Sequence, residues 1–115
     1  MSFYIIPSPI GNLDDITIRS IQVLNRLDFL VVENRSKAKI ILQKHEVQIE
    51  KILVYNDKSN QRDRNKIINL LKCQLSGGIM SEAGTPLISD PGYKLIKELI
   101  RLNVPIVPLP GATSV

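Results

Sequence analysis

The sequence has no tryptophan, one cysteine (Cys73) and one histidine (His45) among its 115 residues. A lone cysteine excludes a disulfide within the chain, and the reducing cytoplasm is the simplest setting for it. His45 has no cysteine or carboxylate at ligand spacing, so we expect no metal site. The sequence shows neither a Ser-His-Asp nor a Cys-His arrangement, and no phosphoryl-transfer signature, so it gives no support to these chemistries.

Long apolar runs are missing as well. No run approaches the roughly 20 residues of a membrane span, and the N-terminus does not have the basic start of a signal peptide, so we expect no membrane contact. The hydrophobic fraction of 43% is nevertheless too high for a disordered chain. A length of 115 residues fits one globular domain. A cleft between two domains would therefore need a second partner.

Basic residues are concentrated in the middle of the chain. The formal net charge is +4, and residues 37–72 hold nine Lys or Arg against four Asp or Glu. This segment is either a set of solvated helix faces or a surface that meets a polyphosphate, RNA above all, through Coulomb attraction and counterion release. Composition alone does not decide between the two.

Short apolar runs alternate with segments of helical periodicity. The runs predict five strands, at residues 3–6, 29–32, 51–55, from 79 onward and at 105–109. The run 29–32 is so uniformly apolar that we expect neither face of its strand to contact water.

The first two predicted helices are assigned from their capping residues. Asp14 and Asp15 offer capping oxygens for a helix with apolar residues at 18, 21, 24 and 27. Ser36 is expected to cap a short second helix, with Ile40 and Ile41 facing inward.

The last two predicted helices have clearer ends. Residues 57–65 look like a polar loop before the third helix, in which Cys73 is expected to be packed and which Gly77 and Gly78 are expected to end. For the fourth helix, Asp90 fits the N-cap and Pro91 fits the first helical position, where no N–H donor is needed.

The alternation of strands and helices predicts an α/β fold, with a mostly parallel sheet of about five strands and helices on both faces. In such sheets ligands bind at the carboxyl ends of the strands. Three unusual loops follow strands here, at residues 7–14, 81–91 and 108–115. We expect topology to bring these loops together at one edge of the sheet.

The loops contain residues suited to a small, positively charged ligand. The loop 7–14 does not have the glycines and lysine of a phosphate-binding P-loop. Ala83 and Gly84 let a ligand approach the backbone closely, and Glu82 stands where a carboxylate can face a cationic group. Structural interpretations remain open: a tight turn for the first loop, a local N–H acceptor for Glu82 and helix capping for Asp90.

Three motifs resemble one known family. They read Tyr-Ile-Ile-Pro-Ser-Pro-Ile-Gly-Asn-Leu-Asp-Asp-Ile-Thr at 4–17, Glu-Ala-Gly-Thr-Pro-Leu-Ile-Ser-Asp-Pro-Gly-Tyr at 82–93 and Pro-Leu-Pro-Gly-Ala-Thr-Ser at 108–114. In this order they resemble the N-terminal domain of the ribosomal RNA small subunit methyltransferase I family, in the tetrapyrrole methylase superfamily. The likeness extends over the whole chain.

The resemblance implies S-adenosylmethionine as cofactor and 2′-O-methylation of a cytidine ribose in 16S rRNA of the small ribosomal subunit. It also implies that residues 1–115 form an N-terminal methyltransferase domain and that the family's C-terminal domain, which completes the cofactor cleft, is absent from this chain. We therefore expect a cytoplasmic homodimer that needs that domain, and an isolated chain without activity. The implied cofactor contacts are Pro9, Ile10, Gly11, Glu82, Ala83, Gly84, Thr85, Gly111, Thr113 and Ser114.

Departures from the family pattern fall partly where we expect the RNA. The family usually has Asp where Glu82 stands, its Glu-Asp-Thr-Arg reads Glu-Asn-Arg-Ser at 33–36, and its His-rich stretch is replaced at 55–58. The residues expected to contact the substrate are Arg35, Lys37 and Lys58.

A ribose hydroxyl is a poor nucleophile, and Glu33 and Asp57 are the two candidate bases that would help it. Two alternatives remain open. One is a methyltransferase of the same superfamily that acts on a tetrapyrrole, and the other is a basic RNA-binding module without a cofactor or enzymatic activity.

Overall fold

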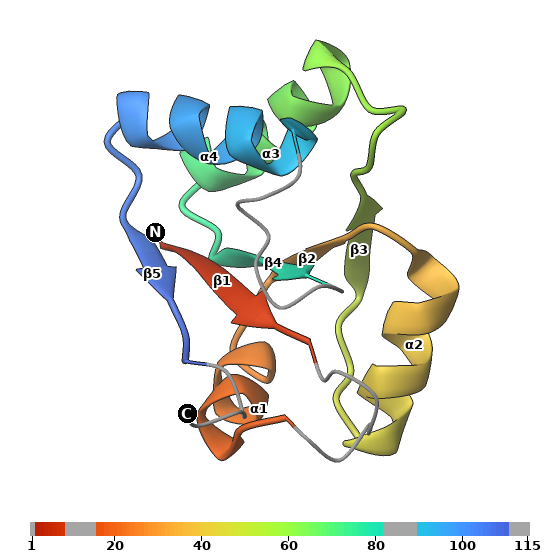
Figure 1. Ribbon diagram of the computed structural model, residues 1–115. Helices are drawn as coiled ribbons and strands as arrows, with labels where there is room; N and C mark the ends of the chain where they lie inside the picture. Colours follow the sequence, from red (N-terminus) through yellow and green to blue (C-terminus); the bar gives the residue numbers. More distant parts are fainter. Residues whose placement is uncertain (1, 9–15, 82–89, 111–115) are drawn as a thin grey trace.

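A computed structural model describes residues 2–8, 16–81 and 90–110 of the chain (Figure 1). Within these ranges, strands and helices alternate: β1 (Phe3–Pro7), α1 (Ile18–Leu24), β2 (Phe29–Val32), α2 (Arg35–Lys44), β3 (Lys51–Val54), α3 (Gln61–Lys72), β4 (Gly77–Ser81), α4 (Asp90–Arg101) and β5 (Ile106–Pro108). Each predicted strand is present, and α4 begins within one residue of its predicted start.

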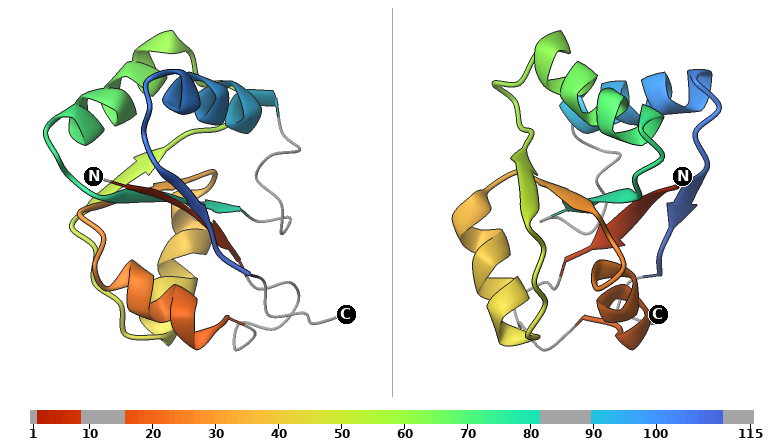
Figure 2. Two further views of the ribbon diagram at one scale, coloured as in Figure 1. Left: turned by 90° about the vertical axis from the view of Figure 1, so that its left-hand side faces the viewer. Right: turned by 180° about the vertical axis from the view of Figure 1, so that it is seen from behind.

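The strands form one sheet in the order β3-β2-β4-β1-β5, and every pairing is parallel. The chain crosses the sheet in one direction from β1 to β3 and returns through β4 to β5. Because strand–helix–strand crossovers are right-handed, the helices of the two directions fall on opposite faces. Figure 2 shows the result, with α1 and α2 on one side of the sheet and α3 and α4 on the other. The predicted fold class is confirmed.

Strand β2 shows how the alternation of side chains divides the core. Phe29 and Val31 pack in the cluster with α3 and α4, whereas Leu30 and Val32 pack in the cluster with α1 and α2. All four side chains are buried, as a strand with helices on both faces requires. The prediction that this strand has no wet face is confirmed.

The prediction that Gly77 and Gly78 end the third helix is wrong. Both lie inside β4, whereas α3 already ends at Lys72. The left-handed backbone after this helix, predicted for a glycine, is adopted by Gln74, with a φ of 66°. Gly77 is needed for space instead, since a Cβ there would overlap the ring of Phe29. Cys73 is the C-cap of α3 and is exposed, so its predicted packing is also wrong.

Asparagine and threonine side chains cap the first three helices, and for α1 and α2 they stand in place of the predicted residues. Thr17 caps α1, accepting from the Ser20 N–H at 3.0 Å, while the predicted Asp14 and Asp15 lie outside the described residues. Asn34 caps α2, so Ser36 already lies within the helix. The cap position needs extended backbone, which Asn34 has.

The third helix begins earlier than predicted. Asn60 and Asp63 form a capping box, in which the Asn60 side chain accepts from the Asp63 N–H and the Asp63 carboxylate accepts from the Asn60 N–H. Residues 61–65 are therefore helical and not part of a loop.

Two isoleucines assigned to apolar helix positions face water. Ile18 is 76% exposed in the first turn of the short helix α1, and Ile40 is 54% exposed on α2. The buried stripe of α2 consists of Ala38, Ile41 and Leu42, at the i, i+3 and i+4 spacing of one helix face, and Ile40 lies off that stripe. The inward orientation is thus confirmed for Ile41 and wrong for Ile40.

Candidate functional site at the carboxyl edge of the sheet

The three motif-bearing loops begin side by side. Strand β1 lies between β4 and β5, and its last residue, Pro7, is the register partner of Ser81 at the end of β4. On the other side Ile5 of β1 pairs with Pro108 at the end of β5, and the Leu109 N–H donates to the Ile5 carbonyl at 2.9 Å. The predicted convergence is therefore confirmed for the points at which these loops leave the sheet (Figure 1).

The loop residues themselves lie outside the described ranges. This applies to every predicted cofactor contact, namely Pro9, Ile10, Gly11, Glu82, Ala83, Gly84, Thr85, Gly111, Thr113 and Ser114. Their roles stay predictions. Ser8, the last described residue before the first loop, has only 6% of its surface exposed, so the chain leaves β1 within the packed interior.

The ends of β2 and β3 continue the same edge and are joined to each other. The Tyr55 N–H donates to the Val32 carbonyl at 2.8 Å, and the Asn56 side-chain amide donates to the Glu33 carbonyl at 3.4 Å. These bonds bring the segments of the two candidate bases together. Glu33 is half-buried, whereas Asp57 is exposed.

A turn held by side-chain hydrogen bonds follows β3. The Asn56 N–H donates to the Ser59 hydroxyl at 2.9 Å, and the Asn56 side-chain oxygen accepts from the Lys58 N–H at 2.9 Å. Such an Asx turn fixes the backbone of residues 56–58. The hydrogen bond uses the backbone N–H of Lys58 and not its side chain. Lys58 is exposed at the carboxyl edge, as a predicted substrate contact should be.

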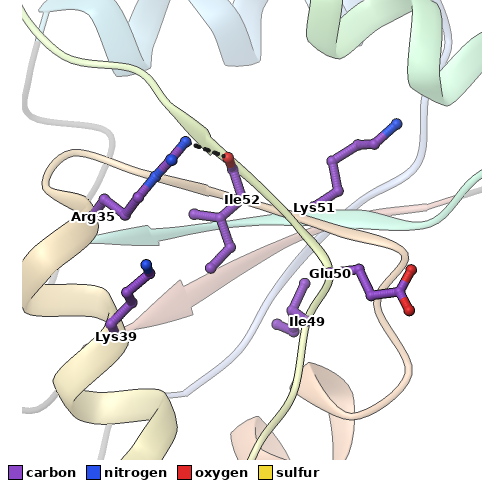
Figure 3. A pocket seen from close by; sticks show the side chains of 6 residues that line it. All are labelled: Arg35, Lys39, Ile49, Glu50, Lys51 and Ile52. Carbon is purple, nitrogen blue, oxygen red and sulfur yellow. Dashed lines mark hydrogen bonds between the residues drawn. The ribbon is translucent and has the colours of Figure 1, made fainter.

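Arg35 links α2 to the edge strand β3. Its guanidinium donates to the Ile52 carbonyl at 2.9 Å, although the side chain is exposed overall (Figure 3). Lys37 lies in the same first turn of α2, and its backbone N–H donates to the capping oxygen of Asn34 at 3.1 Å. Two predicted substrate contacts thus stand at the start of α2, next to Glu33.

A hollow with a volume of about 370 Å³ lies between α2 and β3. Its lining residues are Arg35, Lys39, Ile49, Glu50, Lys51 and Ile52. Lys39 and Lys51 are lining residues that the sequence did not single out as site residues, although both belong to the basic segment 37–72. That charge excess was the available signal, but only the fold shows that the two lysines flank one hollow.

A polar cluster around Arg64 joins α3 to α4 and to Tyr55, the residue that follows β3. The Arg64 guanidinium donates to Glu98 at 3.2 Å, to Gln61 at 2.9 Å and to the Tyr55 hydroxyl at 3.4 Å. The hydrogen bond to Tyr55, together with the charge of Glu98, holds the pKa of Arg64 above its ordinary value against the effect of burial. These contacts link α3, α4 and the segment after β3, so we assign the cluster a structural role.

Two features are not found in the described part of the chain. Residues 2–8, 16–81 and 90–110 contain no group of three or more His, Cys, Asp or Glu side chains that could hold a metal ion. None of the helices in these ranges has the length and apolar character needed to cross a membrane.

Solved structures support the fold. The native form of uroporphyrin III C-methyl transferase from Thermus thermophilus is similar to this chain with a TM-score of 0.71 and 14% identity, over 99% of this chain and 50% of that chain. A structure of the uroporphyrin-III C-methyl transferase from the same organism, complexed with S-adenyl homocysteine, gives a TM-score of 0.67 at 11% identity, over 98% of this chain and 46% of that chain.

Curated relatives are closer in sequence. The ribosomal RNA small subunit methyltransferase I of Rickettsia prowazekii is 44% identical over 96% of this chain and 39% of its own length. The protein of the same name from Thermotoga maritima is 38% identical over 96% of this chain and 50% of its own length. The chain therefore spans half or less of these relatives. Residues 2–115 match the family described as Tetrapyrrole (Corrin/Porphyrin) Methylases, and the chain belongs to that family.

Proposed function

We propose that this chain is the N-terminal half of an S-adenosylmethionine-dependent methyltransferase that modifies the 2′-oxygen of a cytidine ribose in 16S rRNA. The observation that carries the proposal is the set of three motif-bearing loops that leave the adjacent strands β4, β1 and β5 at one edge. The relatives named for small-subunit rRNA support RNA as the substrate.

The cofactor side of the proposal uses the loops after β1, β4 and β5. S-adenosylmethionine would supply the methyl group from its sulfonium. Three glycines, Gly11, Gly84 and Gly111, allow the backbone to approach the cofactor closely, and Glu82 provides a carboxylate for its ammonium group. The other proposed contacts are Pro9, Ile10, Ala83, Thr85, Thr113 and Ser114. The convergence of the loop origins is consistent with one pocket for all of them.

The substrate side uses the ends of β2 and β3. Arg35, Lys37 and Lys58 are exposed there and would contact RNA phosphates. Either Glu33 or Asp57 would accept the proton of the ribose hydroxyl. Most of the catalytic effect would come from holding that hydroxyl in line with the methyl group, an alignment that contributes up to roughly 7–11 kcal/mol in favourable cases.

The proposed enzyme is cytoplasmic and works as a homodimer, and a C-terminal domain completes the cofactor cleft. Because the chain alone would supply half of that cleft, we expect it to have no methyltransferase activity by itself. A clear rate of methyl transfer by residues 1–115 alone would contradict this part of the proposal.

The experiment offers radiolabelled S-adenosylmethionine to the longest natural form of the chain, with undermethylated small-subunit rRNA or a tetrapyrrole as acceptor. We expect label in the RNA and none in the tetrapyrrole. Label in the tetrapyrrole alone would contradict RNA as the substrate and identify the chain as part of a tetrapyrrole methyltransferase. Binding of RNA without binding of the cofactor would favour a non-enzymatic RNA-binding module.

A further inference from the structure

We propose that the hollow between α2 and β3 binds a phosphodiester group of the RNA substrate, with Arg35 and Lys39 as its cationic contacts. The inference rests on the proposed function, because it takes RNA as the substrate. It goes further by assigning a phosphate site on the outer edge of the sheet, away from the loops that follow β1, β4 and β5.

Arg35 is held in position for an anion. A guanidinium has five N–H donors. That of Arg35 donates one hydrogen bond to the Ile52 carbonyl, at 2.9 Å. The bond restrains a long side chain that would otherwise sample many rotamers, and it leaves further donors at the surface. A restrained planar guanidinium matches the geometry of a phosphate and loses less conformational entropy when it binds one.

Lys39 adds a second positive charge on the same side of the hollow. It lies four residues after Arg35 on α2, a spacing that places the two side chains on one helix face. Figure 3 shows both side chains rising from α2 beside β3. Lys39 is exposed and takes part in no ion pair within the described ranges, so its charge is available to a ligand.

The remaining charged residues of the lining are Lys51 and Glu50. Lys51 pairs with Phe29, which packs on the α3 side of the sheet, and its side chain extends away from Arg35 and Lys39 in Figure 3. Glu50 extends away from Arg35 and Lys39 in Figure 3. The hollow is therefore cationic on its α2 side. The carboxylate of Glu50 would moderately repel a phosphodiester anion, and a neutral residue at this position would remove that repulsion.

The position of the hollow suits a polymer. Strand β3 is at the margin of the sheet, so its outer side has no neighbouring strand to obstruct a long ligand. Arg35 is the first residue of α2, two residues after Glu33 at the carboxyl end of β2. An RNA strand held in the hollow would thus continue directly to the edge where we propose that the ribose is methylated.

The test measures the affinity of the longest natural form for a fluorescently labelled single-stranded segment of small-subunit rRNA, by anisotropy at several salt concentrations. Arg35→Ala and Lys39→Ala should each weaken binding and reduce the slope of log K against log salt by about 1. Glu50→Gln should tighten binding. The matched controls Arg101→Ala and Lys94→Ala remove exposed cations from α4, on the other face of the sheet, and should leave both quantities unchanged.

Two further measurements separate the possible outcomes. Lys39→Ala breaks no hydrogen bond given by the structure, so it tests the site even if Arg35→Ala loosens the contact with β3. Cofactor affinity, measured by calorimetry, should be the same in all variants. RNA binding that is undetectable, or equal in the wild type and both α2 variants, would overturn the inference. A third outcome is RNA binding that weakens as expected in Arg35→Ala and Lys39→Ala, while the wild type transfers no methyl group to the RNA. This outcome would overturn the proposed function and support the phosphate site.

Discussion

The ring of Phe29 covers Gly77, its register partner on the neighbouring strand β4. On the other side of Gly77, its partner in β1 is Phe3, whose ring centre lies 6.5 Å from that of Phe29. Both phenylalanines are fully buried. The ring of Phe29 thus occupies the space that a side chain at Gly77 would need, and it packs near the ring of Phe3.

Gly77→Ala is expected to destabilise the fold by about 1–3 kcal/mol, the usual cost of overpacking a core. The new Cβ would overlap the buried ring of Phe29, so the ring or the backbone would have to shift. Gly78→Ala is the matched control and should cost less, because the nearest atoms to its Cβ lie at 3.1 Å. Urea unfolding measures both losses. Phe29→Leu should recover part of the loss in the Gly77→Ala background, and strictly additive effects would contradict the contact.

Asn60→Ala should reduce the free energy of unfolding by about 0.5–2 kcal/mol, as the loss of an N-cap does. The Asn60 side chain accepts from two N–H groups of α3, those of Arg62 and Asp63. Asn69→Ala is a suitable control because Asn69 is exposed within the same helix. Alanine favours helix there, so no loss is expected. Equal losses in the two variants would mean that Asn60 does not act as a cap.

Arg64→Lys should destabilise the protein by about 1–2 kcal/mol, since a lysine cannot replace a fork that donates to three side chains. The three partners are Glu98, Gln61 and Tyr55. Lys66→Arg on the exposed side of α3 is the control and should have little effect. Thermal unfolding of both variants provides the comparison.

The loss at Arg64 should not depend on pH between about 6 and 9. The pKa of Arg64 is raised in the folded protein, so its contribution is complete below the unfolded pKa and disappears only as the pH rises through the still higher folded value. Both values lie far above this range. A loss that fades between pH 6 and 9 would show that a different group is responsible.

Glu33→Gln is expected to lower the rate of methyl transfer by roughly 10²–10⁴-fold, the usual contribution of a general base. Cofactor affinity should stay the same. Asp57→Asn is the companion variant, and a small effect there would assign the role to the half-buried Glu33. The pH dependence of the rate distinguishes a base from a structural residue, because only loss of the base removes the acidic limb of the profile. Unchanged rates in both variants would exclude both carboxylates.

The fold follows largely from the apolar runs. The run 29–32 predicts a strand buried on both faces, and its residues divide between two core clusters. The predictions that failed depend on local backbone conformation. Glu46, Gln74 and Asn103 adopt positive φ after α2, α3 and α4. The sequence had suggested a glycine at the end of α3 alone. Capping by Asn34 in place of Ser36 likewise depends on which residue is extended, and composition does not fix that.

The candidate site was predictable to a different degree at its two sides. The motifs identified loops whose origins the sheet order brings together, because β1 lies between β4 and β5. Arg35 was expected near the substrate, but its bond to the Ile52 carbonyl joins residues 17 positions apart. Such a contact depends on the pairing of β2 with β3, so no local pattern reveals it. The same holds for the hollow that Lys39 and Lys51 flank.

The most direct test of the proposed reaction locates the transferred methyl group. The longest natural form of the chain is incubated with labelled S-adenosylmethionine and undermethylated small-subunit rRNA, and the RNA is digested to nucleosides and separated. We predict that the label elutes as 2′-O-methylcytidine. Label on a base, on another nucleoside or nowhere in the RNA, with the cofactor bound, would contradict it.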